Sequence, residues 1–437
     1  MKRYDSYKDS GIEWIGEIPS HWKIMKTSHC FEQIGSGTTP TAGNSEYYEN
    51  GEFNWLQTGD LTDGEIFETS KRITQKALNN YSALRFYSKD SLVIAMYGAT
   101  IGKTGFLKIE TTTNQACCVL SKPKNLNSRF AFYWLNYIKP HLISLSYGGG
   151  QPNINQEQIR NLKINCPPFS EQISIISYLD QKTTEIDRLI ADKEELLKLY
   201  EEEKTAVINQ AVTKGINPKV KMKDSGIEWL GEIPEHWEVA PLKRYAKITD
   251  GSHFSPKTIS EGYPYVSVKD IGTNTIDLKN CSKISEEDFL QLERNGCRPK
   301  KGDLLLTKDG TIGRAAIVTD QYKPFVILSS LGLITPNKEF TLEYLYYFLI
   351  SGINIDQMYS LIHGSALTRL TIEKIKNLLV CCPPILDQEN LVFYIKDKIT
   401  RIDAKIEDTQ KLIELLKEYR TALISEVVTG KVKVIQD

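Results

Sequence analysis

Residues 170–215 read SEQISIISYLDQKTTEIDRLIADKEELLKLYEEEKTAVINQAVTKG, and this stretch decides the fold. Its largely apolar positions recur at alternating steps of three and four residues, which is the heptad pattern of one long helix. Adding 216 to each position finds the same pattern at the end of the chain. The first seam comprises Ile176, Leu179, Thr183, Ile186, Ile190, Lys193, Leu197, Tyr200, Lys204, Val207 and Ala211.

Each of these helices should contain about 45 residues and extend roughly 65 Å at 1.5 Å per residue. A helix with one apolar stripe must cover that stripe with a partner. The copy of the same seam elsewhere in the chain is the simplest partner. We therefore predict that the two helices pair antiparallel as an intramolecular coiled coil.

Three further repeats show that the whole chain is a tandem duplication. Residues 8–22, KDSGIEWIGEIPSHW, match residues 223–237 at thirteen of fifteen positions, and we call these two stretches the opening segments. The tetrapeptide at 100–103 (TIGK) returns at 311–314 (TIGR). The pattern Asn-Leu, Cys-Pro-Pro, Gln of residues 161–172 returns 216 residues later. A repeated unit of this length predicts two copies of one supersecondary plan.

Between the repeated parts the two copies diverge, and their patterns mix short strands with one aromatic helix. Strands are expected at 91–96, 116–121, 263–268 and 303–307, and helices at 128–139 and 341–351. We predict an α+β fold with pseudo-two-fold repetition, divided at 1–165, 166–215, 216–381 and 382–437. Ser170 and Asp387 are candidate caps for the long helices, and Gly215 and Gly430 are candidate stops.

Composition favours a globular intracellular protein. The chain has 437 residues, 41% hydrophobic and 25% charged, and lacks a run of eighteen apolar residues, so neither a membrane span nor a signal peptide is predicted. The eight cysteines form no Cys-x-x-Cys pair, which favours a reducing cytoplasm over a zinc site or disulfide framework. A net charge of −1 gives no sign of a polyanionic partner.

Three stretches imitate catalytic signatures without completing them. Residues 98–104 resemble a phosphate-binding loop but have one residue too few between the glycines. Cys166 stands where the Asn/Asp-Pro-Pro-aromatic motif of adenine methyltransferases needs its polar residue, so helix entry explains the Pro-Pro pair better. The Gly35-Ser36-Gly37 stretch lacks the following carboxylate of a dinucleotide site and is interpreted as a mobile loop. No motif argues for catalysis, and His21 and His236 are interpreted as structural.

The remaining chemistry lies in polar loops. Gln and Asn can form paired hydrogen bonds with adenine, Arg and Lys with guanine, and Thr can contact phosphate or the thymine methyl group. Ordinary solvated loops are an equally good explanation for any single residue. The candidate DNA contacts are Thr38, Thr39, Gln57, Thr58, Tyr97, Lys103, Gln151 and Asn153 in the first copy, and Ser252, His253, Lys257, Lys269, Lys308, Thr311, Arg314 and Arg369 in the second.

These features together resemble a type I restriction-modification specificity subunit. The resemblance rests on the doubled opening segment, the Thr-Ile-Gly-Lys/Arg turn, the Asn-Leu, Cys-Pro-Pro, Gln pattern and the Ile-Asp pairs at 186–187 and 402–403. It implies two target-recognition domains separated by a coiled-coil spacer, with the chain itself non-catalytic. It also implies double-stranded DNA as ligand, two modification subunits that bind S-adenosylmethionine, and restriction subunits that use ATP and Mg.

Two related but different domains should read two different half-sites. If a two-fold axis relates the copies, their loops match the local dyad of duplex DNA, with half-sites about one helical turn, roughly 34 Å, apart. A partner bound twice needs one surface twice, so the opening segments and outer helix faces are the expected docking surface, with Trp14, Trp22, Trp229 and Trp237 as candidates. The rival interpretations are a coiled-coil adaptor that binds only proteins and a self-contained DNA methyltransferase.

Overall fold

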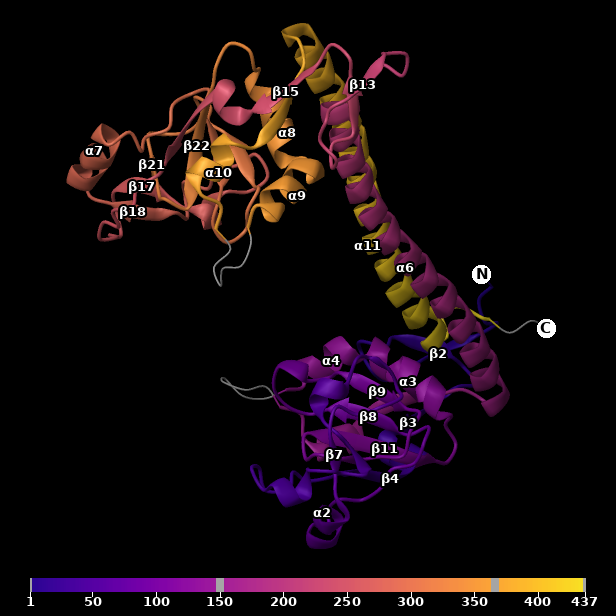
Figure 1. Cartoon of the computed structure of the whole chain (residues 1–437). Helices are drawn as coiled ribbons and strands as arrows, with labels where there is room; N and C mark the ends of the chain where they lie inside the picture. Colours follow the sequence, from indigo (N-terminus) through magenta and orange to yellow (C-terminus); the bar gives the residue numbers. More distant parts are fainter. Residues whose placement is uncertain (1, 147–152, 363–368, 435–437) are drawn as a thin grey trace. The chain divides into compact units, whose positions relative to one another are not determined.

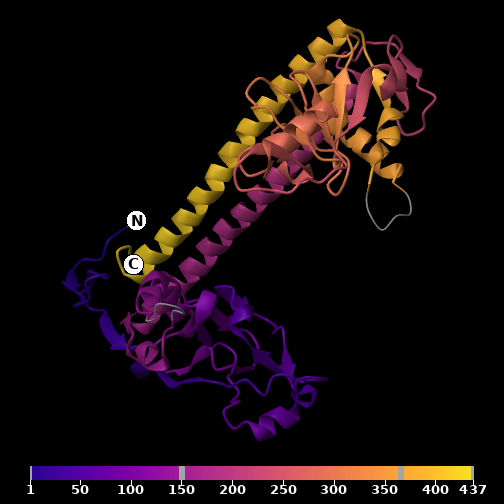
Figure 2. The same cartoon turned by 90° about the vertical axis from the view of Figure 1, so that its left-hand side faces the viewer.

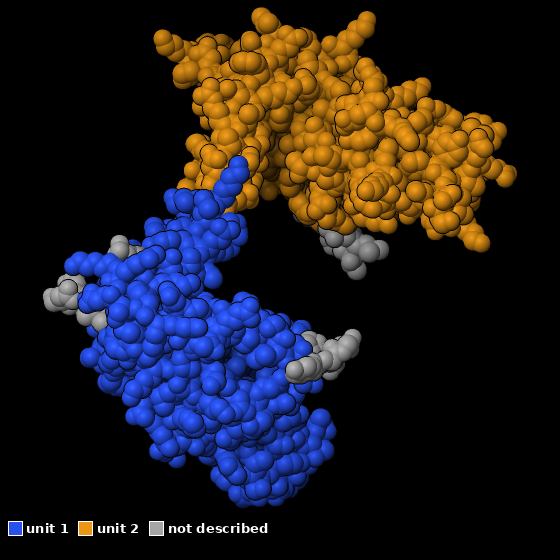
Figure 3. Space-filling view, turned by 180° about the vertical axis from the view of Figure 1, so that it is seen from behind, with its two compact units in different colours: residues 1–193, 411–437 blue, residues 194–410 orange. Residues whose placement is uncertain are grey.

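The computed structural model describes residues 2–146, 153–362 and 369–434. The chain divides into two compact units, coloured separately in Figure 3. Unit 1 comprises residues 1–193 and 411–437, and unit 2 comprises residues 194–410. Each unit therefore combines one α+β domain with parts of both long helices. No helix among the described residues is long and apolar enough to cross a membrane.

The two long helices are α6 (Phe169–Lys214) and α11 (Ile385–Val428). In each unit a segment of α6 lies beside a segment of α11 (Figures 1 and 2). In unit 1, Arg420 Nε donates to Asp187 Oδ1 at 2.7 Å, and in unit 2 the repeat-equivalent pair joins Lys204 Nζ to Asp403 Oδ1 at 2.9 Å. In unit 1, Asn165 just before α6 also donates to the carbonyl of Val428 at the end of α11. The start of α6 therefore lies beside the end of α11, and the two helices run antiparallel there as predicted.

The ends of the long helices correct one prediction and confirm another. Helix α6 begins at Phe169 and α11 at Ile385, so Ser170 and Asp387 lie inside the helices and are not their caps. The main-chain N–H of Gln172 already donates to the carbonyl of Pro168, which places the start of the helix before Ser170. Gly215 and Gly430 follow the helix ends with φ of 71° and 76°, the left-handed conformation of a helix stop.

Unit 1 is built on a five-stranded sheet in the order β4-β11-β8-β9-β6. A smaller three-stranded sheet has the order β10-β5-β7, and its strands are interspersed along the chain with those of the larger sheet. The remaining strands form two pairs, β1-β2 and β3-β12. The strand bounds are β1 Tyr7–Asp9, β2 Glu17–Pro19, β3 Lys23–Lys26, β4 Phe31–Ser36, β5 Phe53–Leu56, β6 Gly64–Ile66, β7 Arg72–Ile73, β8 Leu92–Ala95, β9 Thr104–Leu107, β10 Thr112–Thr113, β11 Cys117–Pro123 and β12 Lys163–Cys166. The helices are α1 Thr27–Cys30, η1 Ser45–Tyr47, η2 Thr58–Asp60, α2 Gln75–Asn80, η3 Gly98–Thr100, α3 Ser128–Tyr137, α4 Lys139–Ser144 and α5 Gln156–Asn161.

Unit 2 repeats this plan with a four-stranded sheet, β16-β22-β19-β20, and a three-stranded sheet, β18-β17-β21. Its strands are β13 Met222–Asp224, β14 Glu232–Pro234, β15 Glu238–Pro241, β16 Ala246–Asp250, β17 Tyr263–Val266, β18 Ser282–Ile284, β19 Leu304–Thr307, β20 Ala315–Ile317, β21 Val326–Ile327, β22 Leu331–Pro336 and β23 Leu379–Cys382. Its helices are η4 Leu242–Arg244, η5 Val268–Asp270, α7 Glu286–Arg294, α8 Leu342–Ile350, α9 Gly352–Ser360 and α10 Ile372–Lys376.

The main core of each unit joins its domain to the long helices. In unit 1 the aromatic helix α3 packs with Ile175 and Leu179 of α6 and with Val427 of α11. In unit 2 helix α8 packs with Ile208 of α6 and Ile395 of α11. The predicted strands and aromatic helices are confirmed to within a few residues. Each domain is thus fixed to its helix pair by buried apolar surface.

Candidate nucleic-acid interface

The strand register of unit 1 brings four separate loops to one end of the sheet. Ser36, at the end of β4, lies opposite Cys118 near the start of β11, and Cys118 lies opposite Ile94 of β8. Ile94 in turn lies opposite Thr104, the first residue of β9. The loops that follow β4, join β8 to β9 and precede β11 therefore share one edge. Parallel pairing of β5 with β10 adds the turn after Leu56.

We call residues 37–41, 57–60, 97–103, 114–116 and 153 the loop edge of unit 1. All the candidate contacts of the first copy lie on it except Gln151, which is outside the described residues. Thr39 Oγ1 donates to Gln115 Oε1 at 2.6 Å, and the carbonyl of Thr38 accepts from Trp55 Nε1 at 3.2 Å. Tyr97 forms a bridge with Asn153, and its side chain is 42% exposed.

Sequence reasoning missed Gln115, which is exposed on this edge beside Thr39. The polar run at 111–115, TTTNQ, was a signal that could have found it. The same register corrects the interpretation of residues 35–37 as a mobile loop. Gly35 and Ser36 belong to β4, and the buried Gly37 donates its main-chain N–H to Thr113 Oγ1 at 3.0 Å. Lys103, in contrast, follows the tight turn at Gly102 as predicted, with φ of 75° at that glycine.

Unit 2 forms the equivalent loop edge from residues 251–257, 267–270, 308–314, 328–330 and 369. Asp250 at the end of β16 lies opposite Gly332 of β22, and Leu306 of β19 lies opposite both Gly332 and Ala315, the first residue of β20. The parallel pair β17 and β21 brings in the turn after Val266. All eight candidate contacts of the second copy map to this edge.

Most of these candidates are exposed. Six are open to solvent: His253, Lys257, Lys269, Thr311, Arg314 and Arg369. Ser252 is buried, and its Oγ accepts from the main-chain N–H of Phe254. Arg369 Nε lies 3.3 Å from Asp309 Oδ1, and Arg314 Nη1 donates to the carbonyl of Ile271 at 3.4 Å. Phe254, 49% exposed, is a residue of this edge that sequence reasoning missed.

Lys308 differs from the other candidates because its side chain is 1% exposed. Its ammonium lies 3.3 Å from Asp250 Oδ1, and the other oxygen of that carboxylate lies 3.0 Å from His253 Nε2. A buried lysine needs such a partner, because desolvation of an unpaired charge is costly. Lys308 is therefore a buried lysine paired with Asp250. The sequence led us to expect an exposed side chain at this position, and the structure corrects that expectation.

The two loop edges have the same backbone features although their sequences differ. A Cβ on Gly37 would lie 1.8 Å from the carbonyl oxygen of Thr113, and one on Gly251 would lie 2.0 Å from that of Leu328. Asp60 and Asp270 cap equivalent turns, η2 and η5, by accepting from the main-chain N–H of residues 57 and 267. The bridge between Tyr97 and Asn153 recurs as Asp309 with Arg369. One scaffold therefore carries two different sets of side chains.

The Cys-Pro-Pro stretch that resembles a methyltransferase motif has a structural role. Cys166 ends β12, and Pro167 and Pro168 lead directly into α6. Asn165 is fully buried and donates Nδ2 to the carbonyl of Val428 at 3.3 Å, so it holds a helix end. Burial raises the pKa of Cys382 to about 11, which leaves that thiol neutral. All eight cysteines are free, and the described residues contain no cluster of metal-ligating side chains.

The family model for the type I restriction modification DNA specificity domain matches residues 19–199 and again residues 234–418. The chain belongs to this family. It therefore carries two DNA specificity domains, one mainly in each unit, and each match includes one loop edge. Specificity subunits of this family are in general non-catalytic.

Known proteins of similar length agree with this assignment. The type I restriction enzyme MjaIX specificity subunit of Methanocaldococcus jannaschii is 26% identical over 96% of this chain and 95% of its own length. The MjaVIII specificity subunit of the same organism is 23% identical over 95% of this chain and 94% of its own length. The EcoBI specificity subunit of Escherichia coli is 22% identical over 78% of this chain and 73% of its own length.

Solved structures share the fold. A chain from a study of complex assembly and conformational transition of the type I R-M system has a TM-score of 0.70 at 14% identity, covering 95% of this chain and 99% of that one. The crystal structure of the HsdS subunit from Thermoanaerobacter tengcongensis has a TM-score of 0.56 at 15% identity, covering 95% and 98%. The specificity-subunit fold thus extends over nearly all of this chain.

Proposed function

We propose that this chain selects the DNA target of a type I restriction-modification complex by reading a split, asymmetric sequence. Each loop edge reads one half-site, and α6 with α11 sets the spacing between them. The observation that carries the proposal is the pair of loop edges, which share strand register and turn geometry but expose different polar side chains. The same backbone conformation in both edges would hold side chains in equivalent positions against DNA. Because those side chains differ, the two edges would select different bases.

The chemistry of the complex belongs to partner subunits in this proposal. Two modification subunits would bind S-adenosylmethionine and methylate adenine, and restriction subunits would use ATP and Mg. The doubled opening segments offer both modification subunits the same surface. Among their tryptophans, Trp22 and Trp237 are buried, whereas Trp229 is 41% exposed. Its repeat counterpart Trp14 is half-buried and stacks on His141 with ring centroids 4.5 Å apart, so a surface shared by both copies rests on other residues of the opening segments.

Selection of DNA from a random pool by the assembled complex tests the proposal. We expect enrichment of two different half-sites about one helical turn apart, roughly 34 Å. Replacing residues 1–165 by the corresponding domain of another specificity subunit should change one half-site and leave the other intact. A change in both half-sites would refute independent reading. A pool without any enriched sequence would favour a protein-binding adaptor, and S-adenosylmethionine binding by the isolated chain would favour a methyltransferase.

Lys103→Ala is expected to weaken DNA binding without changing the preferred sequence. Lys103 sits at the tight turn of the loop edge, where a phosphate contact would add affinity but no base information. The binding free energy should weaken by about 1 kcal/mol. The slope of log affinity against log salt concentration should fall by about one, as expected for the loss of one phosphate contact. The measurement is a binding titration of the assembled complex at several salt concentrations.

Lys89→Ala is the matched control. Lys89 is exposed but precedes β8, at the opposite end of the strand from the turn that carries Lys103. Its removal should leave affinity and salt dependence unchanged. Equal affinity of the Lys103→Ala complex and the parent at matched salt would remove Lys103 from the interface.

A further inference from the structure

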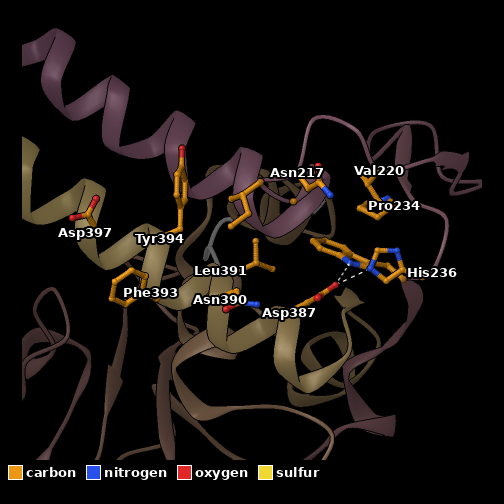
Figure 4. A pocket seen from close by; sticks show the side chains of 13 residues that line it. Asn217, Val220, Pro234, His236, Asp387, Asn390, Leu391, Phe393, Tyr394 and Asp397 are labelled. Atoms are coloured by element: carbon orange, nitrogen blue, oxygen red, sulfur yellow. Dashed lines mark hydrogen bonds and ion pairs between the residues drawn. The ribbon is translucent and has the colours of Figure 1, made fainter.

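Unit 2 contains an open cavity where its opening segment meets α11. The cavity has a volume of about 530 Å³ (Figure 4). It is lined by residues 215–220 just after α6, by Pro234, His236 and Trp237, and by the first turns of α11. Asp387 lies at its wall and accepts from His236 Nε2 at 2.7 Å and from Trp237 Nε1 at 3.4 Å. Both contacts use the Oδ2 atom of Asp387.

The equivalent position in unit 1 is occupied by a tyrosine of the chain itself. Tyr4 is 8% exposed, and its ring centroid lies 5.7 Å from that of His21 and 5.8 Å from that of Trp22. Its hydroxyl donates to Glu171 Oε2 at 3.3 Å. Glu171 is the repeat counterpart of Asp387, and it also accepts from Trp22 Nε1 at 2.8 Å and lies 2.6 Å from His21 Nε2.

Unit 2 has no such tyrosine. By the offset of the opening segments, the residue equivalent to Tyr4 is Lys219, which is exposed and donates its main-chain N–H to the Asn217 side chain. Among the described residues, no hydrogen-bond donor reaches Asp387 Oδ1. The Glu171 carboxylate in unit 1 thus has three hydrogen-bond partners. Its counterpart Asp387 has two, and it lies beside an open cavity. The missing donor is the phenol.

The surroundings of the cavity in unit 2 also differ from those in unit 1. Phe393 is 76% exposed and Leu386 is 68% exposed, whereas the repeat-equivalent positions in unit 1 are Ser177 and Ser170. Exposed side chains of this size beside a hollow are typical of a binding surface. Because these side chains are not duplicated, a partner that docks here would bind once per chain.

We propose that this cavity binds a tyrosine side chain from a polypeptide other than this chain. The chain itself provides the template, because Tyr4 fills the corresponding place in unit 1. The walls of the cavity offer the ring apolar contact with Trp237 and Leu391, and Asp387 Oδ1 offers the phenol an acceptor.

A labelled peptide of residues 2–6, KRYDS, tests the proposal by fluorescence anisotropy with the full chain. We expect saturable binding with one peptide per chain, and at least tenfold weaker binding of a peptide with Tyr4→Ala. The chain variant Asp387→Ala should bind the peptide at least fivefold more weakly. Glu389→Ala is the control, because Glu389 lies in the same first turns of α11, is exposed, and does not line the cavity.

The duplication supplies an independent test within one molecule. In the full chain, Tyr4→Ala should empty the equivalent site in unit 1 and raise the peptide stoichiometry from one to two. Equal binding of the tyrosine and alanine peptides, or no binding at millimolar peptide, would overturn the proposal. Sedimentation would reveal a second copy as occupant: a concentration-dependent dimer abolished by Asp387→Ala would overturn the assignment to a different polypeptide.

Discussion

Gln388→Leu is expected to lower the free energy of unfolding of unit 2 by about 3 kcal/mol. Gln388 is fully buried, and its Oε1 accepts from the main-chain N–H of Thr341 at 2.7 Å. Its Nε2 donates to the carbonyls of Glu339 and Pro383, both at 2.8 Å. Leucine keeps the volume but removes all three hydrogen bonds to main-chain groups, and each loss costs on the order of 1 kcal/mol or more.

The two units need not unfold together, so the loss should be read locally by amide hydrogen exchange in β23 and α8. Gln172 makes the same three contacts in unit 1, with Asn127, Asn125 and Pro167, and Gln172→Leu should destabilise that unit by a similar amount. Gln181→Leu is the control, since Gln181 is exposed on α6 and donates its side-chain amide to Glu185. A change at Gln388 no larger than at Gln181 would contradict the assigned role.

The duplication explains why so much of the scaffold could be predicted from the sequence. Gln172 and Gln388 recur 216 residues apart, as do Asp187 and Asp403, because both copies use them at the same junctions. Heptad spacing predicted the helices, since the pattern is local and extends over many turns. A local pattern repeated twice in one chain needs no knowledge of distant contacts.

The loop edges could be predicted only as separate loops. Their convergence depends on strand register, such as Ser36 opposite Cys118, which joins parts of the chain more than eighty residues apart. The burial of Lys308 follows from the same kind of contact, because Asp250 comes from a different strand. Composition identifies a lysine in a polar loop, but the position of its ammonium is decided by tertiary packing.

Differences between the copies were harder to detect than their likeness. Tyr4 and Lys219 precede the matched opening segments, so the comparison of repeats left them out. Only the geometry around Glu171 and Asp387 shows that one site is filled and the other open. In a duplicated protein, a position where one copy loses a buried side chain is a place to search for a ligand.

Gly37→Ala is expected to destabilise unit 1 by about 3 kcal/mol and to weaken recognition of its half-site. The added Cβ would lie 1.8 Å from the carbonyl oxygen of Thr113, which belongs to the main chain and cannot rotate away. Overpacking against a side chain costs about 1–3 kcal/mol, and a main-chain neighbour places this case at the upper end. The loop after β4 must then move away from β10, which displaces Thr38 and Thr39 from the loop edge.

Gly251→Ala is the same experiment in unit 2, where the Cβ would lie 2.0 Å from the carbonyl oxygen of Leu328. Gly59→Ala is the control on the loop edge of unit 1, because a Cβ there meets nothing within 4 Å and stability should change by less than about 0.5 kcal/mol. Binding of DNA with one half-site randomised separates the effects. Gly37→Ala and Gly251→Ala should each lose discrimination at one half-site only, because the backbone of each loop edge positions only its own contacts. Loss at both half-sites would show that the two edges do not act separately.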